Sequence, residues 1–183
     1  EVDYVQVHNN LDDGIEFFGG TVSARHVVLT GNADDSLDWT DGWQGNIQFL
    51  QIDQADDAGD NGIEADNREG DENAQPRSMP SIANMTINGN PGERGIRLRR
   101  GTGAFLYNSY VTDNATCLDI SGESLALLET DIIFDGVSLN CAEAVDGGTA
   151  EVQAFLDNSN VNQNGGAVAP ADLSADAFFE NTD

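Results

Sequence analysis

The sequence contains no lysine, and seven arginines stand against 33 Asp and Glu residues. The formal net charge is −26 over 183 residues. A chain this acidic repels nucleic acid and anionic membrane surfaces, so both are poor partners. The charge also destabilises the compact state unless cations neutralise it. Two explanations fit the composition: bound divalent cations, or a surface adapted to a salty medium.

Other common signals are also missing. The sequence has no apolar run of membrane-spanning length and no signal peptide. It also lacks EF-hand spacing, a glycine-rich calcium nonapeptide, a phosphate loop, zinc spacing and a Ser-His-Asp arrangement. Its hydrophobic content of 39% is too high for a disordered acidic tail, so we expect one folded domain over residues 1–183. The chain begins directly on a strand-like pattern, and we expect it to be the C-terminal part of a longer exported β-helix protein.

A repeat is the strongest positive signal. Asn10–Phe17 and Asn32–Trp39 lie 22 residues apart and match as Asn, apolar, Asp, Asp, small, apolar, acidic, aromatic. Short runs with period-two alternation, which indicate strands, continue toward the C-terminus. A fixed period of this length is typical of a solenoid. The sequence therefore predicts an all-β, right-handed parallel β-helix of about six coils of 22–26 residues.

One register position of the repeat is dominated by asparagine. The residues that close the first strand of each coil are Asn10, Asn32, Ala55, Asn90, Asn114 and Asn140. Asn tolerates the left-handed backbone of a sharp corner, and stacked Asn side chains can satisfy turn amides along the solenoid. The second strand carries inward apolar pairs at Ile15/Phe17, Leu37/Trp39, Ile63/Ala65, Ile96/Leu98 and Leu118/Ile120.

Three segments interrupt the repeat. A polar stretch with two prolines predicts a loop insertion near 66–81. Residues 121–130 predict a helical turn. Residues 169–179 predict a short C-terminal helix that caps the last coil, because an open solenoid end is an unpaired edge.

Paired aspartates follow the asparagine corner. We expect Asp12/Asp13, Asp34/Asp35 and Asp56/Asp57 to stack at one turn of three neighbouring coils. Carboxylates about 5 Å apart repel by roughly 0.8 kcal/mol in water and by more where water is thinned. A Ca²⁺ ion, which prefers oxygen ligands, would relieve this repulsion. The alternative is a solvated acidic turn.

A second polar column lies on the outward face of the second strand. Its members are Glu16, Asp38, Glu64, Arg97 and Asp119. Carboxylates with an arginine could support glycoside hydrolysis or a lyase reaction on a uronate. The simpler interpretation is a polar outer face with cross-coil pairs such as Glu64 with Arg97.

The remaining candidates are arginines, aromatics and cysteines. Arg97 and Arg99, within the cluster Arg94–Arg100, either neutralise the acidic third coil or bind an anionic sugar. Phe18 and Trp43 lie at or beyond strand ends and are candidate sugar-binding aromatics, although packing under a turn is the favoured interpretation for Trp43. Cys117 and Cys141 lie about one coil apart, which predicts a disulfide.

Several segments resemble a known protein group. Residues 12–20, 31–39 and 59–67, and the closing residues 176–183, are similar to secreted or outer-surface bacterial parallel β-helix proteins of pectate-lyase-like fold, many of them lipoprotein-like. The resemblance implies a surface location and further coils N-terminal to this chain. It carries no established catalytic residues to transfer.

Two functions are consistent with these observations. The first is an exported, Ca²⁺-stabilised module, secreted or on the outer cell surface, with a structural, adhesive or carbohydrate-binding role toward a polysaccharide or cell-surface component. The second is a polysaccharide-active enzyme, a lyase before a glycoside hydrolase, that uses Glu16, Asp38, Glu64 and Arg97.

Overall fold

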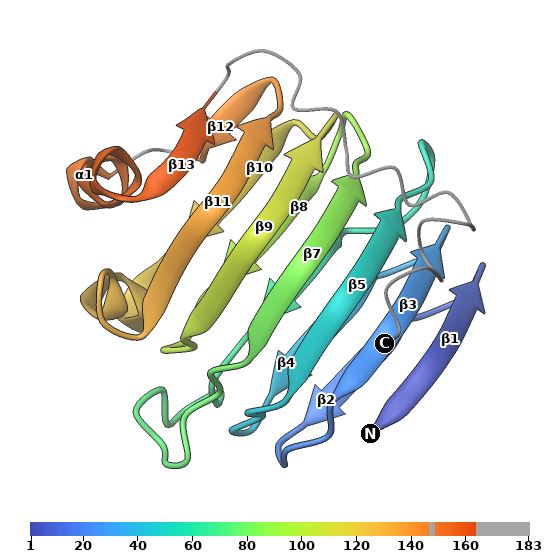
Figure 1. The fold of residues 1–183 in the computed structure, drawn as a ribbon, viewed down its shortest axis with the longest axis horizontal. Helices are drawn as coiled ribbons and strands as arrows, with labels where there is room; N and C mark the ends of the chain where they lie inside the picture. The colour runs from blue at the N-terminus through green and yellow to red at the C-terminus, as the bar shows by residue number, and fades with distance from the viewer. Residues whose placement is uncertain (147–148, 164–183) are drawn as a thin grey trace.

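The chain winds into a parallel β-solenoid of about seven turns in the computed structural model, which describes residues 1–146 and 149–163 (Figure 1). One sheet has the strand order β1-β3-β5-β7-β9-β11-β13, and the other has the order β12-β10-β8-β6-β4-β2. The first sheet contains β1 (Val2–His8), β3 (Ala24–Thr30), β5 (Asn46–Asp53), β7 (Ser81–Asn88), β9 (Ala104–Thr112), β11 (Ile132–Asn140) and β13 (Asn160–Gln163). The second contains β2 (Ile15–Phe18), β4 (Leu37–Thr40), β6 (Asn61–Ala65), β8 (Arg94–Leu98), β10 (Thr116–Ile120) and β12 (Glu143–Val145).

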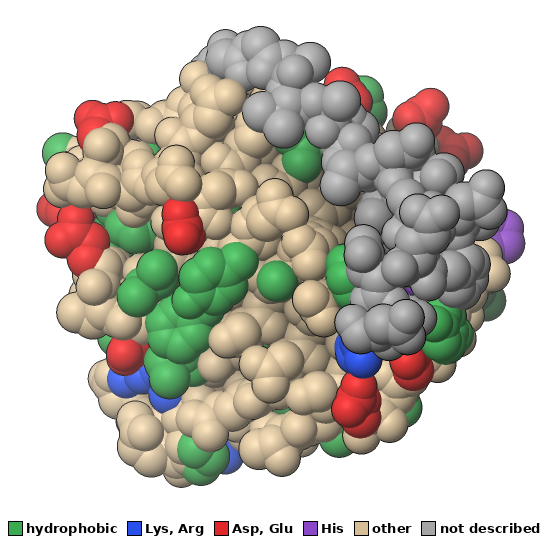
Figure 2. Space-filling view, viewed as in Figure 1, with side chains coloured by type: hydrophobic (Ala, Val, Ile, Leu, Met, Phe, Trp, Pro, Cys, Tyr) green, Lys and Arg blue, Asp and Glu red, His purple; other side chains and the backbone are tan. Residues whose placement is uncertain are grey.

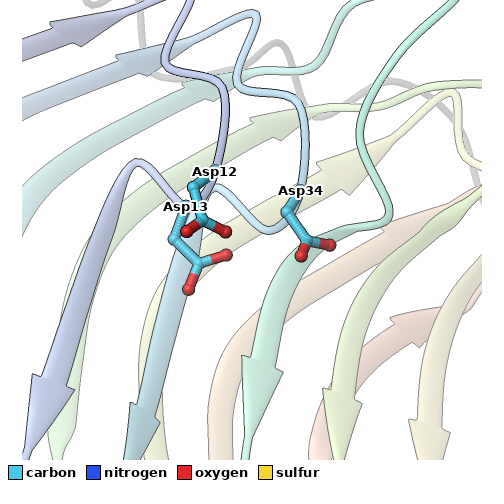
Figure 3. A group of neighbouring side chains, drawn as sticks. All are labelled: Asp12, Asp13 and Asp34. Atoms are coloured by element: carbon cyan, nitrogen blue, oxygen red, sulfur yellow. The ribbon is translucent and has the colours of Figure 1, made fainter.

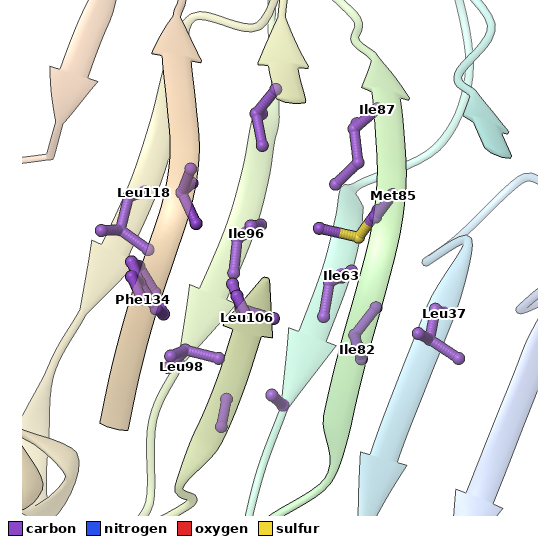
Figure 4. Close-up of a cluster of buried hydrophobic side chains, with 14 of the residues drawn as sticks. Leu37, Ile63, Ile82, Met85, Ile87, Ile96, Leu98, Leu106, Leu118 and Phe134 are labelled. Carbon is purple, nitrogen blue, oxygen red and sulfur yellow. The ribbon is translucent and has the colours of Figure 1, made fainter. Parts of the chain in front are cut away.

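Equivalent apolar residues of successive coils form continuous columns between the two sheets (Figure 4). Leu37 pairs with Ile63 and Ile63 with Ile96, and all three side chains are fully buried. The inward pairs predicted on the second strand are therefore confirmed from β2 to β10. This column packing holds each second-sheet strand in register, and so places the polar residues between the inward ones at fixed heights.

The asparagine corner differs from its predicted geometry. The left-handed residues are Asn9, Gly31 and Asp113, each one position before an expected asparagine. The asparagines themselves make the expected hydrogen bonds along the solenoid. Asn32 accepts from the Asn10 amide at 3.3 Å, and Asn90 donates to the Ala55 carbonyl at 2.9 Å.

The last predicted anchor, Asn140, is two positions out of register. Asn140 pairs with Thr112 in the β9–β11 ladder, and the amide of Ala142 meets the carbonyl of Asn114. The coil is therefore longer than the asparagine spacing indicated. The seventh strand of the first sheet, β13, also exceeds the predicted six coils.

Six strands of the first sheet, from β1 to β11, each contain a residue in the left-handed conformation. These residues form a column of Tyr4, His26, Phe49, Asn84, Asn108 and Gly136. The Tyr4 and His26 rings stack with centroids 4.5 Å apart, and the Asn108 amide donates to Asn84 at 2.6 Å. Stacking of like side chains thus stabilises a strained backbone position in coil after coil.

The predicted insertion is confirmed as the loop between β6 and β7. Asn67 is fully buried and holds this loop together, since its side chain donates to the carbonyls of Glu72 and Ala74 and accepts from the Ser78 amide. The predicted helical turn is a 3-10 helix, Gly122–Leu127. The helix predicted over 169–179 lies outside the described residues. A helix that the sequence did not reveal, α1 (Ala150–Asn158), packs Val152, Phe155 and Leu156 against the core instead.

The predicted disulfide between Cys117 and Cys141 is present, with Cα atoms 5.4 Å apart. It joins β10 to the turn after β11 and closes a loop of 24 residues. No helix in the described part of the chain has the length and hydrophobicity to cross a membrane.

Candidate cation-binding site

Three columns of acidic residues meet where the chain enters β2, β4 and β6. The strand register aligns Glu16, Asp38 and Glu64, and continues them into Arg97 and Asp119. The turns before the strands supply the other two columns. We call the acidic set the acidic ribbon; it consists of Asp12, Asp13, Glu16, Asp34, Asp35, Asp38, Asp60 and Glu64.

Hydrogen bonds along the solenoid fix the turn columns. The Asp35 amide donates to an Asp13 carboxylate oxygen at 3.0 Å, and the Asn61 amide donates to Asp35 at 2.8 Å. The Asp60 amide meets the Asp34 carbonyl at 3.2 Å. A backbone N–H of the neighbouring coil therefore positions the carboxylates of Asp13 and Asp35, whereas the backbone itself links Asp34 to Asp60.

The prediction that Asp56 and Asp57 continue the aspartate stack is wrong. Both side chains are exposed, and Asp60 and Asn61 occupy the third level instead. The physical reason is a longer turn, since five positions separate Asn32 from Leu37 but eight separate Ala55 from Ile63. Asp60 lies four residues before Glu64, just as Asp34 lies four residues before Asp38. An alignment that starts from the strands, rather than from the corner asparagines, therefore identifies Asp60 as the equivalent of Asp34.

The ribbon carboxylates lie close enough to share ions. Oxygens of Asp12, Asp13 and Asp34 lie within 4.8 Å of one another, and Figure 3 shows that the three side chains come from two adjacent turns. The same limit holds for three further groups, formed by Asp13, Glu16 and Asp38, by Asp34, Asp35 and Asp60, and by Asp35, Asp38 and Glu64. Neighbouring groups share members, so the ribbon offers a continuous series of all-oxygen ligand sets.

Burial makes ionisation of the central carboxyls costly. Burial, together with the charges of Asp13 and Asp35, raises the pKa of Asp38 to about 8. Burial also raises the pKa of Asp35 to about 7, although hydrogen bonds from Asn61 oppose the shift. At neutral pH these groups hold protons or require a compensating cation.

The pKa values of four other ribbon carboxyls are raised as well. Burial is the main factor that raises the pKa of Asp13, of Glu16 and of Asp34, and neighbouring carboxylates add to it in each case. Burial also raises the pKa of Glu64, against the opposing charge of Arg99.

In the described part of the chain, arginines neutralise the acidic ribbon at Glu64, its member on β6. Arg97 lies 3.2 Å from Glu64 and 3.4 Å from Asp119, and Arg99 pairs with both Glu64 and Asp66. Among the described residues, the ribbon members other than Glu64 are in no ion pair. Arg97 and Arg99, predicted as ligand-binding residues, are thus held by internal carboxylates, and the cross-coil Glu64–Arg97 pair is present.

The two candidate sugar-binding aromatics, Phe18 and Trp43, differ in solvent exposure. Phe18 is 67% exposed beside the ribbon, as expected for its position. Trp43 is fully buried, which excludes it as an exposed sugar-binding residue and agrees with the favoured interpretation of packing under a turn. Its ring stacks on Phe17 at 4.2 Å and its Nε1 donates to the Val22 carbonyl. Trp39 is also buried, and its indole donates to Thr102.

Comparison with known proteins gives one family. A family model described as a pectate-lyase-like β-helix domain matches residues 1–175. No curated protein and no solved structure matches the chain.

Proposed function

This chain belongs to the pectate-lyase-like β-helix family, and on that premise we propose that it is an extracellular, Ca²⁺-stabilised β-helix module with a structural role at the cell surface. Domains of this family are often extracellular. The calcium concentration outside cells is high enough to occupy sites of low affinity. An adhesive or carbohydrate-binding role is compatible with the same scaffold.

The acidic ribbon is the observation that carries the proposal. Seven carboxylates that form no ion pair with any described residue are stacked at the spacing of adjacent coils, and burial raises the pKa of Asp38 to about 8. A divalent cation among them would replace mutual repulsion by attraction and remove the need for protonation. The all-oxygen donor set suits Ca²⁺ rather than Zn²⁺ or copper.

Isothermal titration with Ca²⁺ tests this proposal. The protein should bind Ca²⁺ with release of protons at pH 7, because Asp35 and Asp38 are partly protonated in the ion-free state. The double variant Asp34→Asn/Asp38→Asn should lose this binding. The matched control, Asp56→Asn/Asp57→Asn, removes the same charge outside the ribbon and should keep it. Equal loss in both variants would show non-specific charge screening and contradict the proposal.

A polysaccharide-active enzyme is the second candidate, and one observation favours it. Asp38 retains a proton near neutral pH and lies beside Glu16, which is the pairing of a general acid with a carboxylate partner. Arg97 is less suited to act as a base, because Glu64 and Asp119 hold its guanidinium. Incubation with neutral and uronate polysaccharides should then give products that disappear in Glu16→Gln and Asp38→Asn. Absence of products from the wild-type protein would remove this candidate.

A further inference from the structure

A second surface feature lies on the outer face of the first sheet, on strands that the acidic ribbon does not use. Outward positions on β5 are polar, with Asn46 and Gln48 exposed. On β9 and β11 the equivalent positions carry Phe105, Tyr107 and Ile133. Tyr107 is 39% exposed and Ile133 is 37% exposed. The solenoid does not need apolar side chains here, because its core lies on the opposite side of these strands.

These side chains form one patch. Phe105 on β9 pairs in register with Ile133 on β11, and Tyr107 pairs with Asp135. The two residues of each pair therefore lie side by side on adjacent strands, which are about 4.8 Å apart. The small residues Ser81 and Ala83 on β7 leave the other flank of the aromatic rings open. Figure 2 shows hydrophobic side chains gathered over the lower part of β9 and β11, with acidic side chains beside them.

A cavity of about 350 Å³ adjoins this patch, between β11 and the end of α1. Ile133 and Asp135 belong to both features, and the cavity adds the polar side chains of Glu129, Asn158 and Asn160. Asn158 donates to Glu129 at 3.0 Å, and Asn160 donates to Asp135 at 2.8 Å. Each amide fixes one oxygen of its carboxylate, and the second oxygen of each carboxylate keeps its capacity to accept a hydrogen bond.

The chemistry of this surface selects the ligand class. None of the residues that line the patch or the cavity is basic, and two are carboxylates, so anionic sugars are disfavoured. Strands β9 and β11 are paired on both sides, so a peptide cannot add to them through its main chain. An exposed aromatic ring beside fixed hydrogen-bond acceptors is suited to a ligand with an apolar face and hydroxyl donors.

We propose that the Tyr107–Ile133 patch and the adjoining cavity bind a neutral saccharide, with a pyranose ring on Tyr107 and its hydroxyls donating to Asp135 and Glu129. This site is separate from the acidic ribbon. The two proposals therefore stand or fall independently, and sugar binding should be unaffected by chelator.

A titration of the whole chain with a panel of neutral hexasaccharides tests the proposal, with cellohexaose, laminarihexaose, mannohexaose and xylohexaose as probes. At least one should bind saturably with a Kd near or below about 1 mM. Tyr107→Ala should weaken that binding about tenfold or more, and Tyr107→Phe should keep it within about threefold because the ring remains. Val22→Ala, which truncates an exposed side chain outside the patch, is the matched control and should bind as the wild type does.

Three results would overturn the proposal. The first is failure of every neutral hexasaccharide to bind at 10 mM, about ten times the expected Kd. The second is binding that Tyr107→Ala leaves unchanged although the variant keeps the wild-type melting temperature. The third is preferential binding of trigalacturonate or of an oligo-arginine peptide, which would identify a different ligand class.

Discussion

The substitution Asp38→Asn should shift the stability of the protein in opposite directions with and without Ca²⁺. Asparagine keeps the volume of the side chain but removes the charge that burial makes costly. In chelator at high pH the variant should therefore be more stable than the wild type. In saturating Ca²⁺ it should lack a ligand, and the advantage should disappear or reverse.

The magnitude follows from the pKa of Asp38, which burial raises from 3.8 to about 8. Because the folded-state pKa is the higher one, the stability linked to this proton is complete below about pH 4 and lost as the pH rises through about 8. A shift of about four units corresponds to an upper limit of about 6 kcal/mol. Screening of a carboxyl that is still partly solvated reduces this to about 2–3 kcal/mol. For a chain of this length, the gain at pH 8.5 corresponds to about 5–10 °C in Tm.

Thermal melts followed by circular dichroism measure this effect. Wild type, Asp38→Asn and the control Asp56→Asn are compared at pH 8.5 and pH 5, each with chelator and with excess Ca²⁺ at equal ionic strength. The control should change by no more than about 1 °C, since its carboxylate is exposed. If Asp38→Asn lowers the Tm in chelator at pH 8.5, or keeps the full Ca²⁺ gain, the account of the ribbon is incorrect.

One chemical reduction and two variants test separate parts of the structure. Reduction of the Cys117–Cys141 disulfide should cost about 3 kcal/mol, seen as a lower denaturant midpoint in the presence of reductant. Trp43→Ala should destabilise by about 3–5 kcal/mol in a urea titration, whereas an exposed ligand-binding residue would cost under 1 kcal/mol. Asn67→Ala should cost about 1–3 kcal/mol and expose the loop before β7 to proteolysis; an unchanged cleavage rate would contradict its bridging role.

The parts of the fold that depend on side-chain periodicity were predictable from the sequence. Inward residues such as Leu37 and Ile63 recur at matching positions because each coil must bury the same face on the next. The disulfide followed from the same logic, as the two cysteines lie about one coil apart.

Residue positions that depend on turn length were not predictable from the repeat. Three extra residues before β6 place Asp60, rather than Asp57, at the level of Asp34, and two extra residues move Asn140 out of the corner. Residue identity at a fixed interval cannot detect such changes, because turns lengthen without any cost to the core. Strand-to-strand alignment could have found Asp60.

The burial of Trp43 and the apolar patch around Tyr107 depend on tertiary context. Trp43 is covered because Phe17 stacks on it and the loop before β7 passes over it, with the Met79 amide bonded to its carbonyl. Tyr107 alternates correctly for an outward position, so the sequence shows its direction. The cavity beside it is formed with α1, which the repeat pattern did not include.

The most direct test of the central claim is a thermal melt of the wild-type protein at pH 7.5 and fixed ionic strength, with Ca²⁺ at about 100 times its Kd and then with chelator. Binding to the folded state alone should stabilise it by about 2.7 kcal/mol, so removal of Ca²⁺ should lower the Tm by about 5–11 °C. A change of under about 1 °C, together with a fall in Tm when salt is removed, would contradict a bound cation and indicate that the acidity is an adaptation to salt.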